Sequence, residues 1–387
     1  MEVKQIYEIV NGATTQAIGQ SDLLAEDLSN VVDVGEAILN ARSLDKYTAS
    51  LVDHIGRVIF VNRPYQGDAP SVLRDGWEYG AVLEKIASDM PEAVENESWE
   101  LTDGASYDPN VFKQPTAYAK FYNKRTTFEI DRSITDRQVR SAFSSAAQLD
   151  GFISMLFNEV DKSATVKTSE LIRRTIANMI GETFYNYNAG GTYTGTGNTR
   201  CVNLLALYNN QYSKTLAADD CLYDPDFIRY AVYTMGVYKR RIRSMSTLFN
   251  IGGKARFTPD SLLHFVMLAD FKSAADVFLQ SGTFNQEYTA LPNSESVPYW
   301  QGSGTGYGFD DITAIKCTTA DGHSVNPSGI LGVMFDHDAL GVCNPDRRVT
   351  TNYNPKAEFT NYFYKFDAQY FNDLNENFVV FYAAASE

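Results

Sequence analysis

Asp336-His337-Asp338 brings two carboxylates and an imidazole together, and these groups can bind a divalent cation. Side chains alternate between the two faces of a β-strand, so in a strand the carboxylates would face one way and the imidazole the other. Ligands of one ion must converge on one point. A polar turn is therefore the favoured interpretation and a metal site is the alternative, so we expect no metal.

Two glycine-rich stretches could in principle surround a phosphate: GGTYTGTG at 190–197 and GSGTGYG at 302–308. Neither is followed by the Gly-Lys-Ser/Thr of a P-loop, and neither has the G-x-G-x-x-G spacing of a dinucleotide site. Flexible loops are the favoured interpretation, and we expect no cofactor.

The histidines give no sign of nucleophilic catalysis. The four of them lie in separate segments, and the sequence contains no G-x-S-x-G motif. His54 falls in an apolar stripe, which is typical of a core or boundary residue. We expect the protein not to be an enzyme.

The charge balance argues against a protein that binds nucleic acid tightly. The 387 residues include 33 Lys and Arg against 48 Asp and Glu, a net charge of −15, whereas phosphate binding requires clustered cations. The one basic run, Lys239–Arg243, could contact nucleic acid. At the end of a predicted helix, however, it is expected to complement the helix dipole.

The cysteine spacing and the N-terminal sequence indicate the cellular compartment in which the protein is made. The four cysteines have no C-x-x-C spacing, which favours reduced thiols. MEVKQIYEIV is not a basic leader with an apolar core, and no apolar run reaches the ~18 residues of a membrane span. We expect an intracellular product with no membrane partner.

Residues 63–125, here called the excursion, are interrupted by glycine or proline every few residues, which prevents long elements. Eight carboxylates lie between Glu84 and Asp108 against the single Lys85, yet Trp77, Tyr79 and Trp99 are also present. Ordering about 60 residues costs on the order of 60–100 kcal/mol of backbone entropy. The excursion therefore needs a partner surface.

The strongest helical periodicity covers residues 149–180, with Gly181 predicted to end the helix. Such a helix would be roughly 50 Å long. A shorter helix is predicted before it, with Thr135 as N-cap and Gln138 completing a capping box. Residues 1–50 read as an arm of short helical pieces interrupted at Asn11-Gly12.

The remaining elements are shorter. Asp224-Pro225 predicts a helix start, and 262–268 predicts a buried strand followed by a helix. Residues 362–370 alternate, with Tyr362, Tyr364 and Phe366 on one face. Residues 378–382 are apolar on both faces, as in a central strand. A terminal β-hairpin formed by these two segments is the expected closure of the core.

This order of parts resembles the Hong Kong 97-type major capsid protein of tailed bacteriophages. TASLVDHIGRVIF (48–60) is similar to the segment that precedes the extended loop in capsid proteins of small podoviruses of the Bacillus type. NPKAEFTNYFYKFDAQYF followed by NFVVFYA (354–371 and 377–383) is similar to their aromatic carboxyl-terminal strands. The fold class that the resemblance implies is α+β.

The resemblance also implies a division of the chain. Its parts would be an N-terminal arm (1–55), an extended loop (56–130), a peripheral domain with the spine helix (131–200), an axial domain (201–330) and C-terminal strands returning to the peripheral domain (331–387). We expect no counterpart of the N-terminal scaffold domain of the Hong Kong 97 namesake or of an immunoglobulin-like C-terminal extension. A separate scaffolding protein is therefore expected. No motif marks Lys85, Lys113, Lys120 or Lys124 for covalent cross-linking.

The implied function is that of a major capsid protein. Copies would form the hexamers and pentamers of an icosahedral shell, with a portal protein at one vertex and packaged double-stranded DNA held without sequence-specific binding. Such a protein would be assembled in the host cytoplasm and located in the virion capsid. The alternatives are an encapsulin-type compartment shell and a carbohydrate-active enzyme or binding protein.

Contacts between subunits are expected at the excursion. Its rings would be buried on an adjacent subunit, and its carboxylates would face basic positions of the neighbour's long helix. The candidates are Trp77, Tyr79 and Trp99, the carboxylates of Glu92, Glu95 and Glu97, and the facing Arg173 and Arg174.

Overall fold

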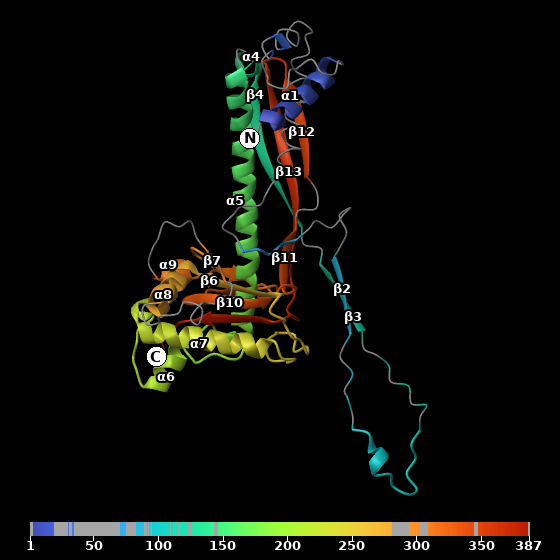
Figure 1. Ribbon diagram of the computed structural model, residues 1–387, viewed down its shortest axis with the longest axis vertical. Helices are drawn as coiled ribbons and strands as arrows, with labels where there is room; N and C mark the ends of the chain where they lie inside the picture. Colours follow the sequence, from blue (N-terminus) through green and yellow to red (C-terminus); the bar gives the residue numbers. More distant parts are fainter. Residues whose placement is uncertain are drawn as a thin grey trace.

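A computed structural model describes residues 3–18, 30, 33–34, 70–74, 83–88, 91, 93, 95–108, 110, 112, 114, 117–122, 125–142, 146–280, 294–301, 309–343 and 347–385. These residues form an α+β fold with one very long helix and two five-stranded sheets (Figure 1). The predicted fold class is confirmed at this level. No helix in this part of the chain combines the length and the apolar character needed to cross a membrane.

The long helix, α5 (Ala146–Tyr187), confirms the predicted spine but extends past it at both ends. The prediction that Gly181 ends the helix is wrong. A Cβ at Gly181 would lie 2.0 Å from the Sγ of Cys317, so the glycine permits close packing inside the helix. The hydroxyls of buried Thr168, Thr175 and Thr183 donate to backbone carbonyls one turn earlier. These polar groups are therefore hydrogen-bonded although they are buried.

The helix before it, α4 (Asp136–Ala142), begins as predicted. The Thr135 N–H donates to Gln138 Oε1 at 3.0 Å, and the Gln138 N–H donates to Thr135 Oγ1 at 3.3 Å. These two bonds satisfy donors that a helix leaves open at its first turn. The capping box is confirmed.

The first sheet runs along the upper part of α5 (Figure 1). Its order is β1-β11-β13-β12, with β4 also paired to β13. The strands are β1 (Leu73–Arg74), β4 (Arg125–Thr135), β11 (Leu340–Cys343), β12 (Arg347–Asn354) and β13 (Phe359–Asn372). An ion pair between Arg132 of β4 and Glu159 ties the sheet to α5.

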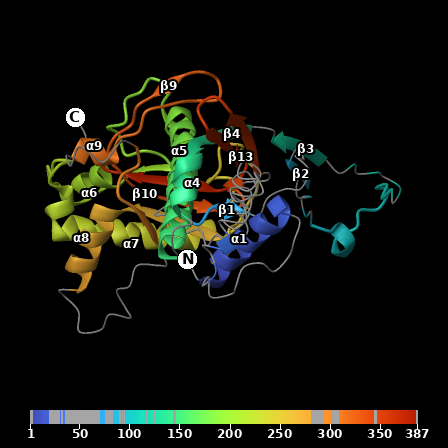
Figure 2. The ribbon, with the colours of Figure 1, turned by 90° about the horizontal axis from the view of Figure 1, so that it is seen from above.

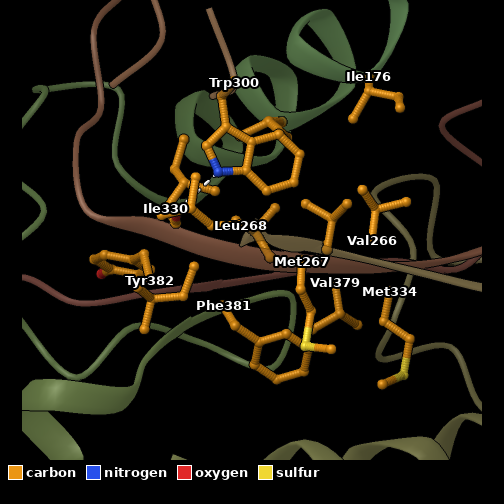
Figure 3. Close-up of a cluster of buried hydrophobic side chains, with 14 of the residues drawn as sticks. Ile176, Val266, Met267, Leu268, Trp300, Ile330, Met334, Val379, Phe381 and Tyr382 are labelled. Atoms are coloured by element: carbon orange, nitrogen blue, oxygen red, sulfur yellow. Dashed lines mark hydrogen bonds between the residues drawn. The ribbon is translucent and has the colours of Figure 1, made fainter. Parts of the chain in front are cut away.

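The second sheet lies at the lower end of α5, with strand order β5-β14-β10-β6-β7. Its strands are β5 (Cys201–Asn203), β6 (Leu263–Leu268), β7 (Glu295–Val297), β10 (Ile330–Asp336) and β14 (Phe378–Tyr382). Figure 3 shows its core, where Trp300 donates its indole N–H to the Ile330 carbonyl at 2.8 Å and Ile176 of α5 lies on the same side of the sheet.

Helices α6 (Leu204–Tyr212), α7 (Pro225–Ile242) and α8 (Ala269–Gln280) belong to this lower part. The predicted start of α7 is confirmed, because the Asp224 side chain accepts from the N–H groups of Asp226 and Phe227 and Pro225 opens the helix. Its last turn carries Lys239, Arg240 and Arg241, as the dipole interpretation predicts. The strand at 262–268 and its following helix are confirmed as β6 and α8. Smaller elements are η3 (Cys221–Tyr223), α9 (Phe309–Thr313), β8 (Cys317–Thr318) and β9 (Ser324–Val325).

The predicted terminal hairpin is wrong. Strand β13 pairs with β4, β11 and β12 in the first sheet, whereas β14 pairs with β5 and β10 in the second. The physical reason is that β14 is buried at every position, so it requires partners on both edges and cover on both faces. The alternation in β13 is confirmed, with Tyr362, Tyr364 and Phe366 buried.

One further expectation needs correction. Helix α1 (Val3–Ile18) continues through Asn11-Gly12, and the hydroxyls of Thr14 and Thr15 donate to the carbonyls of Val10 and Asn11 within it. Strand β3 (Ala117–Tyr122) precedes β4 in the chain. The apolar stripe around His54 and the segment 48–60 lie outside the described residues.

Candidate functional site

The stem of the excursion is a two-stranded antiparallel hairpin that leaves the side of the molecule (Figure 1). Strand β2 (Leu83–Ser88) pairs with β3, and the short helix η2 (Glu97–Trp99) lies near the far end. Seen from above, the excursion extends on the side opposite α6, α7 and α8 (Figure 2). We refer to residues 91–112 as the tip.

The stem is attached to the body by a cluster of charges. Lys85 and Lys120 are register partners in the hairpin, and both contact the Asp373 carboxylate, at 2.9 and 3.0 Å. Lys85 also lies 2.6 Å from Glu376, which in turn contacts Arg256 at 3.1 Å. Three cations and two carboxylates therefore join the stem, the loop before β6 and the segment between β13 and β14.

The electrostatics of this cluster favour the charged forms. Burial by itself would raise the pKa of Asp373, but the hydrogen bond and charge of Lys85, with further hydrogen bonds from Asn375 and Lys120, lower it below its ordinary value. Burial would lower the pKa of Lys85, but its bonds to Glu376 and Asp373 raise it instead. Each partner thus holds the other ionised.

Residues 373–377 hold the carboxylates in place. The Asp373 N–H donates to the Ala339 carbonyl at 2.7 Å, and the Gly252 N–H donates to the Leu374 carbonyl at 2.8 Å. A Cβ at Gly252 would lie 1.9 Å from Asn375 Oδ1, so this approach requires glycine. The segment that the sequence suggested as a hairpin turn instead attaches the stem to the body.

Sequence reasoning missed Asp373, Glu376 and Arg256 as functional residues. The available signal was that Asp373 and Glu376 stand between two strongly aromatic strands, where carboxylates are costly without partners. In the chain, Glu376 is 120 positions from Arg256 and 291 positions from Lys85. No local pattern can reveal such a pairing.

The tip exposes large apolar side chains. The exposed fractions are 95% for Trp99, 83% for Phe112 and 65% for Leu101. Its described hydrogen bonds are local, such as the Thr102 N–H to the Tyr107 hydroxyl at 3.0 Å. Large apolar side chains exposed close together in the sequence are unusual on a folded monomer.

The predicted contact residues divide into three groups. Trp77, Tyr79 and Glu92 lie outside the described residues. Glu95 and Trp99 are exposed at the tip, and Glu97 begins η2.

The two arginines lie on α5 and face tyrosines of their own chain. Arg173 is 5.0 Å from the Tyr299 ring centroid and Arg174 is 5.3 Å from that of Tyr370. Among the described ion pairs, none joins these arginines to the tip.

Asp336-His337-Asp338 forms a polar turn at the end of β10. Asp336 accepts from the Thr258 hydroxyl at 2.7 Å and from the Asp338 N–H at 2.8 Å. His337 Nδ1 lies 3.0 Å from His264 Nε2. Within the described ranges, no group of three or more His, Cys, Asp or Glu residues is placed to hold a metal ion.

The other candidate motifs have structural roles where they are described. The segment 190–197 packs on β5, where Asn203 Nδ2 donates to the Gly195 carbonyl at 2.9 Å. All four cysteines are free thiols, and burial raises the pKa of Cys221 to about 12 and of Cys317 to about 11. His54 and the stretch 302–308 lie outside the described residues.

Comparison with known proteins supplies the family. A family model for the Phi29-like phage major capsid protein matches residues 6–382. The major capsid protein of Bacillus phage B103 is 22% identical over 368 residues, which cover 94% of this chain and 69% of that protein. That of Bacillus phage PZA is 21% identical over 370 residues, with the same two coverages of 94% and 69%.

A solved capsid structure, from Staphylococcus phage Andhra, matches with a TM-score of 0.50 at 10% identity, covering 83% of this chain and 86% of that chain. At this identity the likeness concerns the fold alone. Together these findings confirm the resemblance to capsid proteins of small Bacillus phages and favour a capsid protein over the two alternatives. Because the family match extends over nearly its whole length, this chain belongs to the Phi29-like phage major capsid protein family.

Proposed function

We propose that copies of this chain assemble into hexamers and pentamers of an icosahedral shell, and that the excursion of each copy docks on its neighbour. The observation that carries the proposal is the combination of a rigidly anchored stem with an exposed apolar tip. An anchored stem sets the direction of the tip, and the exposed rings provide the area to be buried. Obligate interfaces of this kind commonly bury about 2,000–5,000 Å².

The proposed division follows the Hong Kong 97-type layout, with arm, extended loop, spine helix, peripheral domain and axial domain. The grouping of β4, β12 and β13 beside α5 supports a peripheral part to which the C-terminal strands return. The second sheet with α6, α7 and α8 fits an axial part, and β10 and β14 join it.

The proposed partners are other copies, a separate scaffolding protein, a portal protein at one vertex and packaged double-stranded DNA, with assembly in the host cytoplasm. They follow from the family resemblance. The net charge of −15 supports a shell whose inner surface contacts DNA without sequence-specific binding. At the neighbour, Arg173 and Arg174 are the proposed partners of Glu92, Glu95 and Glu97, with Trp77, Tyr79 and Trp99 buried beside them.

The experiment replaces residues 91–112 by a short glycine-serine turn and leaves the stem intact. The variant is expected to keep the circular dichroism spectrum and melting temperature of the unassembled wild type but to form no closed shells in negative-stain microscopy and sedimentation. Both chains are expressed with the neighbouring open reading frames. Shells that close at normal size and yield would contradict the docking role. The ratio of absorbance at 260 and 280 nm in wild-type particles tests for packaged nucleic acid.

A further inference from the structure

A hollow of about 530 Å³ lies between the end of α6 and the first half of α7, on the side of the molecule away from the excursion (Figure 2). Four tyrosine rings line it, together with the side chains of Lys214, Asp226 and Arg229. We call it the tyrosine hollow. Its volume falls within the range of about 300–1,000 Å³ that is typical of ligand sites. None of the contacts between copies proposed above uses these residues.

Helix α7 supplies one wall of the hollow as a single stripe. Asp226, Arg229, Tyr230 and Tyr233 follow each other at spacings of three and four, so their side chains share one face of the helix. The buried residues of α7 occupy the other positions. The stripe is about 10 Å long, because each residue of a helix adds about 1.5 Å.

Helix α6 supplies the floor of the hollow. Tyr208 is almost fully buried, and its ring centroid lies 5.1 Å from that of Tyr212 and 5.6 Å from that of Tyr230. The helix ends at Ser213, which has a φ of +52°, and after this turn Lys214 Nζ donates to the Tyr208 hydroxyl at 2.6 Å. A wall that is already formed reduces the entropy that a ligand must overcome on binding.

Two of the rings present their faces to solvent. Tyr212 is 52% exposed and Tyr233 is 70% exposed, whereas the buried Tyr208 ring covers the core beneath them. Among the described residues, neither of these two hydroxyls has a hydrogen-bond partner in the protein. The outer part of the hollow therefore offers apolar ring faces together with open hydroxyl groups.

The three charged groups of the hollow are paired with one another. Asp226 Oδ1 lies 3.4 Å from Arg229 Nη1, and Asp226 Oδ2 lies 3.6 Å from Lys214 Nζ. The three side chains are 42–66% exposed, so these pairs are weak and accessible to a ligand. A guanidinium has five N–H donors and a carboxylate about four acceptor positions, so the pairing leaves capacity on both sides. Donors and acceptors therefore lie side by side with nearly balanced charge.

The complementary ligand has a flat apolar face and hydroxyl groups at its edge. A hydroxyl both donates and accepts, so neighbouring hydroxyls can bond to a carboxylate and a guanidinium that are already paired. The C–H groups on one face of a pyranose ring pack on the electron-rich face of an aromatic ring. A proline-rich peptide also has an apolar face, but its prolines carry no N–H and cannot donate to the carboxylate.

We propose that the tyrosine hollow is a carbohydrate-binding site, with sugar rings on Tyr212 and Tyr233 and sugar hydroxyls bonded to Asp226 and Arg229. The length of the stripe fits a short segment of a polysaccharide chain better than a single sugar ring. The site adds a binding activity to a capsid subunit. It depends neither on shell assembly nor on the docking of the excursion.

The first test compares the full-length unassembled chain with Tyr233→Ala on an array of immobilised bacterial, fungal and plant oligosaccharides. The wild type should bind a defined set of chains, and Tyr233→Ala should lose most of this signal because the exposed ring face is gone. Tyr223→Ala is the matched control and should bind as the wild type does, because Tyr223 is 78% exposed but does not line the hollow. Equal melting temperatures of the three chains exclude misfolding.

The second test measures affinity by calorimetry with the oligosaccharide that gives the strongest array signal and with its component monosaccharide. The oligosaccharide should bind at least about tenfold more tightly than the monosaccharide. Tyr233→Ala and Asp226→Asn should each weaken binding about tenfold, whereas Tyr233→Trp keeps an aromatic face and should retain it.

The outcomes decide the inference independently of the proposed function. Absence of array binding by the wild type, or equal binding by wild type and Tyr233→Ala, would overturn it. If a proline-rich decapeptide binds through Tyr233 and no sugar does, the hollow receives a peptide and the inference is wrong. If Tyr233→Ala prevents shell formation and no sugar binds the wild type, the hollow is a contact between copies. Shells that form without the tip would contradict the docking role alone and leave the carbohydrate site standing.

Discussion

Lys85 and Lys120 stand opposite each other on β2 and β3, and both ammonium groups contact the carboxylate of Asp373, at 2.9 and 3.0 Å. Like charges that face each other across paired strands destabilise a hairpin. Here a shared, buried carboxylate converts the repulsion into an attachment. The hairpin of β2 and β3 is therefore more stable against the body than away from it.

Asp373→Asn should weaken this attachment. The substitution keeps the shape of the side chain but leaves Lys120 without its carboxylate, and we expect a loss of about 1–3 kcal/mol in the free energy of unfolding. The range is below that of a fully buried pair because both lysines are partly exposed. Urea denaturation of the unassembled chain measures it, and limited proteolysis should show faster cleavage in the stem. Asp321→Asn, at an exposed turn, is the control and should change neither.

The attachment should also depend on pH in a definite direction. The pKa of Asp373 is lowered from 3.8, so its contribution to stability is complete above about pH 3.8 and is lost as the pH falls through the lower folded-state pKa. The pKa of Lys85 is raised from 10.5, so its contribution is lost only above that pH. The difference in unfolding free energy between wild type and Asp373→Asn should stay constant from about pH 5 to 9 and shrink below about pH 4. A difference that grows on acidification would contradict the assignment.

Local signals in the sequence predicted the elements that depend on local chemistry. The capping box at Thr135, the proline start of α7 and the periodicity of α5 follow from side chains within a few positions of each other. The sequence also indicated that the acidic excursion has no core of its own, because its composition is acidic and poor in apolar residues.

Long-range partners were not predictable in the same way. The alternation of β13 and the apolar run of β14 indicated two strands correctly, but not that they belong to different sheets, which depends on β4, β10 and β5. Gly181 looked like a helix end because its contact with Cys317 is 136 positions away and invisible locally. The charge cluster of the stem was missed for the same reason.

Proline at an exposed position of α5 tests the helix without disturbing the core. Val166 is 54% exposed within α5, so Val166→Pro removes one backbone hydrogen bond and introduces a clash with the preceding turn at little cost in burial. We expect a loss of about 3 kcal/mol or more in the free energy of unfolding and little or no shell formation. Val166→Ala should be neutral or slightly stabilising, because alanine has the higher helix propensity. Equal stability of the two variants in urea denaturation would mean that residue 166 is not inside a helix.

Two glycines with the same backbone conformation separate strain from close packing. Gly322 and Gly329 have φ values of +85° and +78°, so alanine at either position should cost about 1–2 kcal/mol. A Cβ at Gly322 meets nothing within 4 Å, whereas a Cβ at Gly329 would lie 2.0 Å from the carbonyl oxygen of Ala383, just after β14. Gly329→Ala must therefore also displace the backbone at Ala383, at a further cost of about 1–3 kcal/mol. Urea denaturation of both variants gives this difference directly, and equal losses would show that the segment after β14 can move away freely. A larger loss for Gly329→Ala would show that the carboxyl-terminal segment, which the sequence predicted only as the partner of β13, is fixed against the entry to β10.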